Sequence, residues 1–243
     1  VKMSEKARQV SAFVSHMGLF EWTRMPFGLC NAPATFSNLM RKVLATLKNR
    51  AIFAYLDDVL IASKSVPQHI EEIELLFKRF IETGLTIQPK KSFMFQEELE
   101  FLGFTVGKDG VKASTNKLKA VQEFPRPQTL KQLKGFLALC SYYRRFVKDF
   151  SAIAKPLNNA LRDKPERLKW SPEMETAFQA MKKAMTTPPV LAYPQVGERY
   201  WLECDGSKLG LGCVLSQMQK DGKFHPVAYG SRAVSRTEER YSP

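Results

Sequence analysis

The spacing of apolar residues predicts a series of amphipathic helices along the chain. One helix follows Asn31, and its apolar face is formed by Phe36, Leu39, Met40, Val43, Leu44 and Leu47. A second helix is predicted over 66–83, where apolar residues recur on one side and Gly84 provides a stop. Helices are also predicted within 115–162, with an interruption at "FPRPQT", and after Ser171. The last of these bears Met174, Ala177, Phe178, Met181 and Met185.

Short apolar runs bounded by turn residues predict strands between these helices. They lie at 9–15, 18–22, 85–87, 93–95 and 99–106. Beyond "TTPPVLAYP" the helical spacing gives way to strands at 199–205, 211–217 and 224–230, and a second domain is expected to open near Gly197. This mixture of elements is typical of an α+β protein.

The run "AIFAYLDDVLIAS" at 51–63 places two adjacent carboxylates, Asp57 and Asp58, inside what is expected to be a buried hairpin. Burial of an unpaired charge costs several kcal/mol, so the pair needs an explanation. One interpretation is a simple hairpin turn, where Asp is common. The other is a site for a hard divalent cation, since Mg²⁺ binds carboxylates together with water and substrate phosphates.

Composition narrows the class of protein. Of the 243 residues, 44% are apolar and 11% are aromatic, which is typical of a globular chain. No apolar run approaches the roughly 18 residues of a membrane helix, and no signal peptide is recognisable, so we expect an intracellular protein with no membrane partner. The four cysteines form no CxxC pair, and they are expected to be small core residues.

A formal net charge of +13 favours polyanionic partners. The excess is concentrated between Lys108 and Lys169, where fifteen Lys and Arg stand against five Asp and Glu, a net of +10. Aromatic residues are interleaved with the charge, notably in "SYYRRFVKDF" at 141–150. Basic residues neutralise phosphates and aromatic rings stack on bases or pack in a core, so this segment is expected to face nucleic acid.

Several motifs occur in the order of one known family: "RMPFGLCNAPATF" at 24–36, "YLDD" at 55–58, "FLGFTV" at 101–106, "FLALCSYYRRFVKDFSAIAKPL" at 136–157 and "LECDGSKLGLGCVLSQ" at 202–217. Together they resemble the Pol polyprotein of gypsy-class LTR retrotransposons. The resemblance implies an α+β fold with a reverse transcriptase palm at 1–107, made of an antiparallel sheet and packed helices. It further implies a helical, basic thumb and connection at 108–196 and the start of an RNase H-like α/β domain at 197–243.

The resemblance also implies the chemistry. Polymerases of this kind transfer a nucleotidyl group with two cations about 4 Å apart, Mg²⁺ or Mn²⁺. Asp57 and Asp58 would supply part of that metal site. Asp205, after an apolar strand, would be the first carboxylate and metal ligand of the RNase H site, although an Asp in such a position is often only a turn residue.

Further residues acquire binding roles by resemblance. Pro26, Phe27, Gly28, Tyr55 and Lys91 would contact the incoming deoxynucleoside triphosphate or the template. Core packing is the alternative for Phe27, and a solvated surface position is the alternative for Lys91. The primer grip would be formed by Phe101, Leu102 and Gly103, whose apolar character fits a hairpin core equally well. The nucleic-acid backbone would be held by Arg144, Arg145 and Lys148, for which a solvated helix face is the alternative. The implied partners are an RNA or DNA template, a DNA primer, an RNA–DNA hybrid and other parts of the Pol polyprotein.

The chain departs from the family mainly by what it lacks. The first polymerase aspartate and the fingers are expected upstream of Val1, and the RNase H glutamate and later aspartates beyond Pro243. We therefore expect an excerpt of an RNA-directed DNA polymerase with attached RNase H that is inactive alone, located in cytoplasmic virus-like particles and the nucleus. The alternative is a catalytically dead, nucleic-acid-binding remnant or host-adopted copy.

Overall fold

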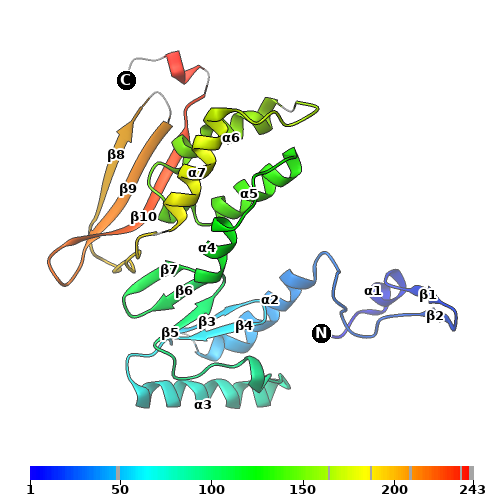
Figure 1. Cartoon of the computed structure of the whole chain (residues 1–243). Coiled ribbons are helices and arrows are strands. Elements are labelled where there is room, and N and C mark those ends of the chain that lie inside the picture. The colour runs from blue at the N-terminus through cyan, green and yellow to red at the C-terminus, as the bar shows by residue number, and fades with distance from the viewer. Residues whose placement is uncertain (48–49, 164, 187, 208–209, 236, 241–243) are drawn as a thin grey trace. The chain divides into compact units, whose positions relative to one another are not determined.

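The computed structural model of the chain describes residues 1–47, 50–163, 165–186, 188–207, 210–235 and 237–240 (Figure 1). It divides into two compact units, Val1–Gln96 and Glu97–Pro243. The boundary between these units lies between Gln96 and Glu97. The division into three parts at 107 and 196 remains a prediction.

The first unit combines short hairpins with two longer helices. In chain order it contains α1 (Glu5–Val10), β1 (Phe13–Ser15), β2 (Gly18–Phe20), α2 (Ala32–Val43), the 3₁₀ helix η1 (Leu44–Leu47), β3 (Ile52–Tyr55), β4 (Asp58–Ile61), α3 (Val66–Thr83) and the 3₁₀ helix η2 (Pro89–Lys91). The strand predicted over 9–15 is correct only for 13–15, because Ser4 caps a helix through its side chain and residues 5–10 continue it.

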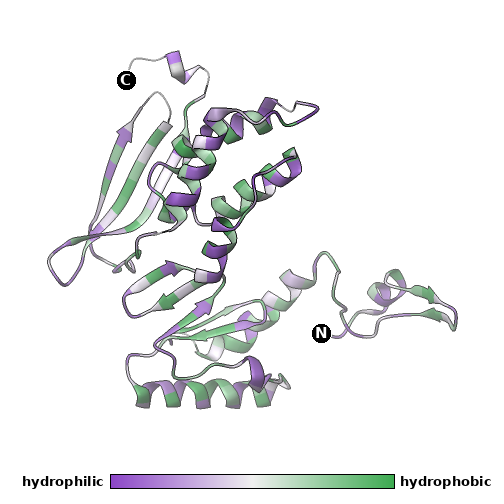
Figure 2. Ribbon diagram, in the orientation of Figure 1, coloured by the Kyte–Doolittle hydropathy of each residue, from purple (hydrophilic) through white to green (hydrophobic). Residues whose placement is uncertain are grey.

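Helices α2 and α3 pack on one face of the β3–β4 hairpin. Met40, Val43, Leu76 and Phe80 are buried together, with Ile52, Val59 and Ile61 of the hairpin against them. The bounds predicted for α3 are confirmed: Ser65 caps its start and Gly84 ends it with φ +69°. Polar and apolar residues alternate around this helix (Figure 2). Asn31 precedes α2, but its side chain makes no capping hydrogen bond.

A buried carboxylate joins the end of the hairpin to α3. Glu72 is fully buried, and it accepts hydrogen bonds from the Ser63 hydroxyl and from Gln68 Nε2, the latter at 2.9 Å. Ser63 Oγ also lies 3.0 Å from His69 Nδ1. These partners satisfy a charge that would otherwise be costly to bury, and they fix where the chain enters α3.

The strands predicted at 85–87 and 93–95 are wrong. Among the described residues neither segment has a strand partner, and Phe93 and Phe95 expose much of their rings. Phe95 adopts a left-handed φ of +55° and its ring contacts His69 edge-on. A short apolar run shows only that residues are apolar, and a strand also needs a neighbour for its backbone hydrogen bonds.

In its described residues, the second unit combines antiparallel sheets with helices. Its elements are β5 (Glu98–Phe101), β6 (Phe104–Gly107), β7 (Gly110–Ala113), α4 (Thr115–Gln122), α5 (Leu130–Tyr142), the 3₁₀ helix η3 (Arg144–Phe146), α6 (Phe150–Asp163), α7 (Pro172–Thr186), β8 (Tyr200–Gly206), β9 (Gly210–Met218), β10 (Phe224–Ala233) and the 3₁₀ helix η4 (Glu238–Arg240). The sheet orders are β5–β6–β7 and β8–β9–β10. The predicted strand 99–106 is thus two strands joined by a turn.

The helices of the second unit enclose its hydrophobic core. Side chains of α5, α6 and α7 are buried together, including Leu133, Phe136, Leu157, Phe178 and Met181. Thr129 and Gln132 form a reciprocal capping box at the start of α5. Of the cysteines expected in the core, only Cys140 is buried, whereas Cys30 and Cys204 are exposed.

Gly212 lets the segment before α6 approach the β8–β9–β10 sheet closely. A Cβ at Gly212 would lie 2.2 Å from Asp149 Oδ1, the residue that precedes α6. Ser231 of β10 adds hydrogen bonds to the backbone and hydroxyl of Ser151. Within the described residues, no helix has both the length and the apolar character needed to cross a membrane.

Candidate functional site

The two adjacent aspartates lie at the tip of the β3–β4 hairpin. Tyr55 pairs with Asp58, so Leu56 and Asp57 form a two-residue turn. Leu56 has φ +53° and Asp57 does not have a positive φ, which is the type II′ pattern. The predicted hairpin is confirmed, but the expected burial of the acids is wrong, because both side chains are exposed beyond the packed face of the hairpin.

The hairpin has one packed face and one open face. Ile52, Val59 and Ile61 pack on the helices, whereas Phe53 and Tyr55 are each 55% exposed on the other side. Direct cross-strand partners point to the same face, so Asp58 shares the open face with Tyr55. An aromatic ring and a carboxylate therefore lie side by side on an accessible surface.

The carboxylates of Asp57 and Asp58 have the chemistry of ligands for hard cations. Their oxygens are the donors that Mg²⁺ prefers, and their exposure leaves room for water and phosphate oxygens. Among the described residues, no group of three or more His, Cys, Asp or Glu side chains is arranged as a metal site. Asp57 and Asp58 therefore fit a metal site to which other groups also contribute ligands.

The loop before α2 and the 3₁₀ helix η2 carry the remaining candidate residues of the first unit. Phe27 is fully exposed, so it takes no part in core packing, and Pro26 beside it is half-buried. Gly28 has φ +92°, which favours glycine. Lys91 ends η2 and is exposed. These residues are available to a ligand.

Leu102 and Gly103 form the turn between β5 and β6. Their φ angles are +51° and +74°, the type I′ pattern with both central residues left-handed. Phe101 and Phe104 pair at its base. Two tyrosine hydroxyls reach the turn: Tyr142 donates to the Leu102 carbonyl at 2.5 Å and Tyr143 to the Gly103 carbonyl at 2.8 Å.

The basic residues that follow α5 divide into two kinds. Arg144 Nη2 donates to the Ser231 carbonyl of β10 at 2.8 Å, so this side chain contributes to packing within the unit. The Arg145 guanidinium lies over the Phe146 ring at 5.8 Å and is exposed, and Lys148 is also exposed. Arg145 and Lys148 offer charge to solvent, whereas Arg144 is already partly engaged.

Asp205 lies near the end of β8 and is exposed. It pairs with Gly212, which pairs in turn with Ser231 of β10. Because cross-strand partners share a face, Asp205 points toward the side on which the Asp149 carboxylate approaches Gly212. The sheet thus presents Asp205 on the same side as the start of α6.

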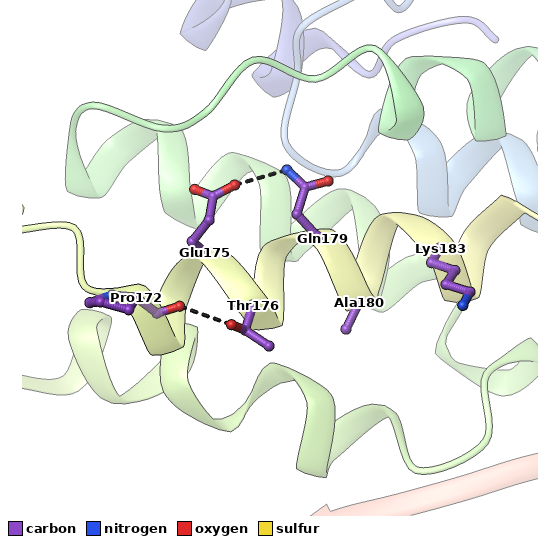
Figure 3. A pocket seen from close by; sticks show the side chains of 6 residues that line it. All are labelled: Pro172, Glu175, Thr176, Gln179, Ala180 and Lys183. Atoms are coloured by element: carbon purple, nitrogen blue, oxygen red, sulfur yellow. Dashed lines mark hydrogen bonds between the residues drawn. The ribbon is translucent and has the colours of Figure 1, made fainter.

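Of two concave surfaces, one lies apart from the candidate residues and the other borders the turn that carries Asp57. One lies on the outer face of α7, where Glu175 accepts a hydrogen bond from Gln179 and Thr176 donates to the Pro172 carbonyl, so these polar groups satisfy each other (Figure 3). Another, of about 580 Å³, runs between α2 and β3 and includes Tyr55 and Leu56. The second concave surface therefore adjoins the hairpin tip that carries the two aspartates.

Three features of the site were not predicted from the sequence. They are the left-handed Leu56, the left-handed Leu102, and the hydrogen bonds of Tyr142 and Tyr143. Glycine or asparagine is the usual signal for a positive φ, and leucine gives none. Tyr143 is buried, and a buried tyrosine hydroxyl requires a partner, so a hydrogen bond of this residue could have been expected.

Two family descriptions match most of the chain. Residues 1–106 match "Reverse transcriptase (RNA-dependent DNA polymerase)", and residues 170–243 match "RNase H-like domain found in reverse transcriptase". Among solved structures, the foamy viral protease-reverse transcriptase in complex with RNA/DNA hybrid has a TM-score of 0.87 and 26% identity, covering 100% of this chain and 32% of that one. The form in complex with dsDNA has a TM-score of 0.89 and 26% identity, covering 100% of this chain and 50% of that one.

Similar curated proteins come from Drosophila melanogaster. The retrovirus-related Pol polyprotein from transposon 297 is 36% identical over 242 residues, covering 100% of this chain and 22% of the relative. The retrovirus-related Pol polyprotein from transposon gypsy is 33% identical over 253 residues, covering 100% of this chain and 24% of the relative. The chain thus spans about a quarter of their length. It belongs to the retrovirus-related Pol polyproteins of gypsy-class retrotransposons and carries parts of their reverse transcriptase and RNase H-like domains.

Proposed function

We propose that this chain is part of an RNA-directed DNA polymerase with an attached RNase H, in which Asp57 and Asp58 are polymerase metal ligands. The observation that carries the proposal is the turn that holds them. Leu56 has a left-handed φ of +53°, which costs about 1–3 kcal/mol for a residue other than glycine. Such strain gathers at active sites, and here it fixes two exposed carboxylates at a hairpin tip.

The proposed metal is Mg²⁺ or Mn²⁺, two per active site. When bound, the cations would neutralise charge that develops on the transferred phosphoryl group. The chain's own contribution is to hold carboxylate oxygens on a short, rigid turn, with Tyr55 beside Asp58 on the open face of the hairpin. Tyr55, Pro26, Phe27, Gly28 and Lys91 are proposed to contact the deoxynucleoside triphosphate or the template, which is consistent with their accessible surfaces.

The proposed nucleic-acid partners are an RNA or DNA template, a DNA primer and an RNA–DNA hybrid. Related foamy viral structures contain an RNA/DNA hybrid or dsDNA. Arg145 and Lys148 present exposed charge that suits backbone phosphates. Phe101, Leu102 and Gly103 are proposed to hold the primer end, and the tight, partly accessible turn that Leu102 and Gly103 form supports this role.

In the second domain we propose that Asp205 is an RNase H metal ligand. Its exposed carboxylate near the end of β8 can accept a cation. We further propose that the chain works with other parts of the Pol polyprotein inside the cell, in cytoplasmic virus-like particles and in the nucleus.

The polymerase assignment is tested by Asp57→Asn in the reverse transcriptase region of the source polyprotein that contains this chain. Loss of a carboxylate that stabilises the transition state should reduce primer extension with Mg²⁺ or Mn²⁺ by about a hundredfold or more. Asp109→Asn is the matched control, because Asp109 is also an exposed aspartate in a hairpin turn. Undiminished extension by Asp57→Asn would contradict the metal role.

The same preparation distinguishes a binding remnant from an enzyme. A protein that binds primer–template duplex with a steep dependence on salt, yet extends no primer even before mutation, would have the basic surface without catalysis. Extension that depends on Asp57 and not on Asp109 supports the enzyme.

A further inference from the structure

The turn at Leu102–Gly103 is held in a conformation that its own sequence does not favour. A type I′ turn needs a positive φ at both central residues, for which Asn-Gly is the usual pair. Gly103 meets this requirement, but Leu102 at φ +51° is strained. Strain of this kind persists only where surrounding contacts determine the conformation.

Those contacts come from consecutive residues at the end of α5. The Tyr142 hydroxyl donates to the Leu102 carbonyl at 2.5 Å, and the Tyr143 hydroxyl donates to the next carbonyl, that of Gly103, at 2.8 Å. The backbone nitrogen of Ser114 donates to the same Gly103 oxygen at 3.3 Å. Both carbonyls of the strained turn are therefore fixed from outside the hairpin.

Ring packing reinforces the hydrogen bonds. The Phe104 ring stacks on Tyr142 with centroids 5.2 Å apart and meets Tyr143 edge-on at 5.7 Å. A Cβ at position 103 would lie 3.3 Å from the Tyr143 hydroxyl oxygen and 3.4 Å from Tyr142 Cε1. Glycine is thus favoured both by the backbone angle and by the closeness of the rings.

The hydroxyls do more than fill the core. Tyr142 is 52% exposed, so phenylalanine would pack against Phe104 equally well and lose only the hydrogen bond to the turn. Tyr143 is 1% exposed, and burial, together with Tyr142 and Glu100, raises the pKa of its phenol to about 12. It therefore remains a protonated donor throughout the physiological range.

We propose that Tyr142 and Tyr143 are positioning residues that fix the Leu102–Gly103 turn to the end of α5 and thereby set the position of the primer end. The proposal rests on the proposed function, in which this turn contacts the primer. The tyrosines themselves touch the turn and not the reacting atoms. Their loss should leave phosphate contacts intact and displace the primer terminus.

The test uses Tyr142→Phe, Tyr143→Phe and the double variant in the reverse transcriptase region that contains this chain. Tyr200→Phe, which removes an exposed hydroxyl on β8, is the matched control. The double variant should lower the maximal rate of nucleotide addition by about tenfold, since misplacement by an ångström costs up to about a hundredfold. Its Kd for primer–template duplex should change by less than about twofold, because phosphate contacts supply most of that affinity.

The rate of amide hydrogen exchange in the peptide that contains residues 102–104 gives a second readout. Exchange should be faster in the double variant than in the unmodified protein, and unchanged in Tyr200→Phe. Rates of nucleotide addition and exchange equal to those of the unmodified protein would overturn the proposal. A rate and a Kd that worsen together with a lower melting temperature would also overturn it, since that is the signature of a merely structural role. An unmodified protein that extends no primer would instead refute the proposed function, and exchange would still report whether the tyrosines fix the turn.

Discussion

The Arg144 guanidinium donates a hydrogen bond of 2.8 Å to the backbone carbonyl of Ser231, 87 residues further along the chain. Arg144 follows Tyr143 directly, so consecutive side chains at the end of α5 bind the β5–β6 turn and strand β10. The contact gives Arg144 a structural role that its neighbour Arg145 does not share. Of the two adjacent arginines, Arg144 therefore stabilises the fold and Arg145 presents charge to solvent, a difference that composition alone does not reveal.

This difference predicts distinct effects of neutralising each basic residue. Arg145→Gln and Lys148→Gln should each reduce the slope of log affinity against log salt for primer–template duplex by about one unit, with stability unchanged. Arg144→Gln should instead lower the free energy of unfolding by about 1 kcal/mol through the lost hydrogen bond. Duplex titrations at several salt concentrations and denaturant unfolding measure the two effects. An unaltered slope in both Arg145→Gln and Lys148→Gln would contradict phosphate contact by these residues.

Asp205→Asn should separate the two activities of the enzyme. In a protein extended through the complete RNase H domain, cleavage of RNA in an RNA–DNA hybrid should fall by about a hundredfold or more, as for other losses of transition-state charge stabilisation. Primer extension should persist, because Asp57 and Asp205 belong to different compact units.

Asp221→Asn is the control for Asp205, since Asp221 is an exposed aspartate in the β9–β10 connection that bonds to His225 at 2.8 Å. Hybrid cleavage by Asp205→Asn at the level of this control would leave Asp205 as a turn residue only.

Periodicity predicted the elements that bury a continuous face. The bounds of α3 and the buried residues Met174, Phe178 and Met181 of α7 are those expected from apolar spacing, because one face of each helix contacts a core. The strands β8, β9 and β10 were also predicted within a few residues, because glycine-containing turns separate their apolar runs.

The sequence was less informative where backbone conformation or long-range contact decides the structure. Leu56 and Leu102 take left-handed angles that leucine rarely adopts, so their residue type did not signal these backbone angles. The apolar runs at 85–87 and 93–95 found no strand partner among the described residues. The contact of Arg144 with Ser231 depends on how α5 and β10 meet, which local pattern does not encode.

Alkaline pH should weaken the second unit through Cys140. Burial raises the pKa of this thiol to about 12, whereas in the unfolded chain it deprotonates near pH 9. The unfolded state then binds fewer protons than the folded state, so stability is greatest below pH 9 and falls as pH rises toward 12. By pH 10 the loss from this group should reach about 1.4 kcal/mol.

Denaturant unfolding at pH 8 and at pH 10 measures the alkaline effect. Cys140→Ala should show a smaller decline between the two pH values, whatever its stability at pH 8, whereas Cys204→Ala should keep the full decline because Cys204 is exposed. Equal declines in the unmodified chain and in Cys140→Ala would contradict the role of the thiol.

Two glycines should respond in opposite ways to alanine. At Gly110, φ is +131° and a Cβ would lie 2.3 Å from the Leu191 carbonyl oxygen, so Gly110→Ala must displace the backbone pair that Val111 forms with Leu191. The cost should be about 1–3 kcal/mol, the usual price of overpacking. Gly135 lies in α5 with nothing within 4 Å of an added Cβ, so Gly135→Ala should stabilise by about 0.5–1 kcal/mol. Denaturant unfolding of both variants tests the pair, and a Gly110→Ala protein as stable as Gly135→Ala would refute the close approach of residue 191 to β7.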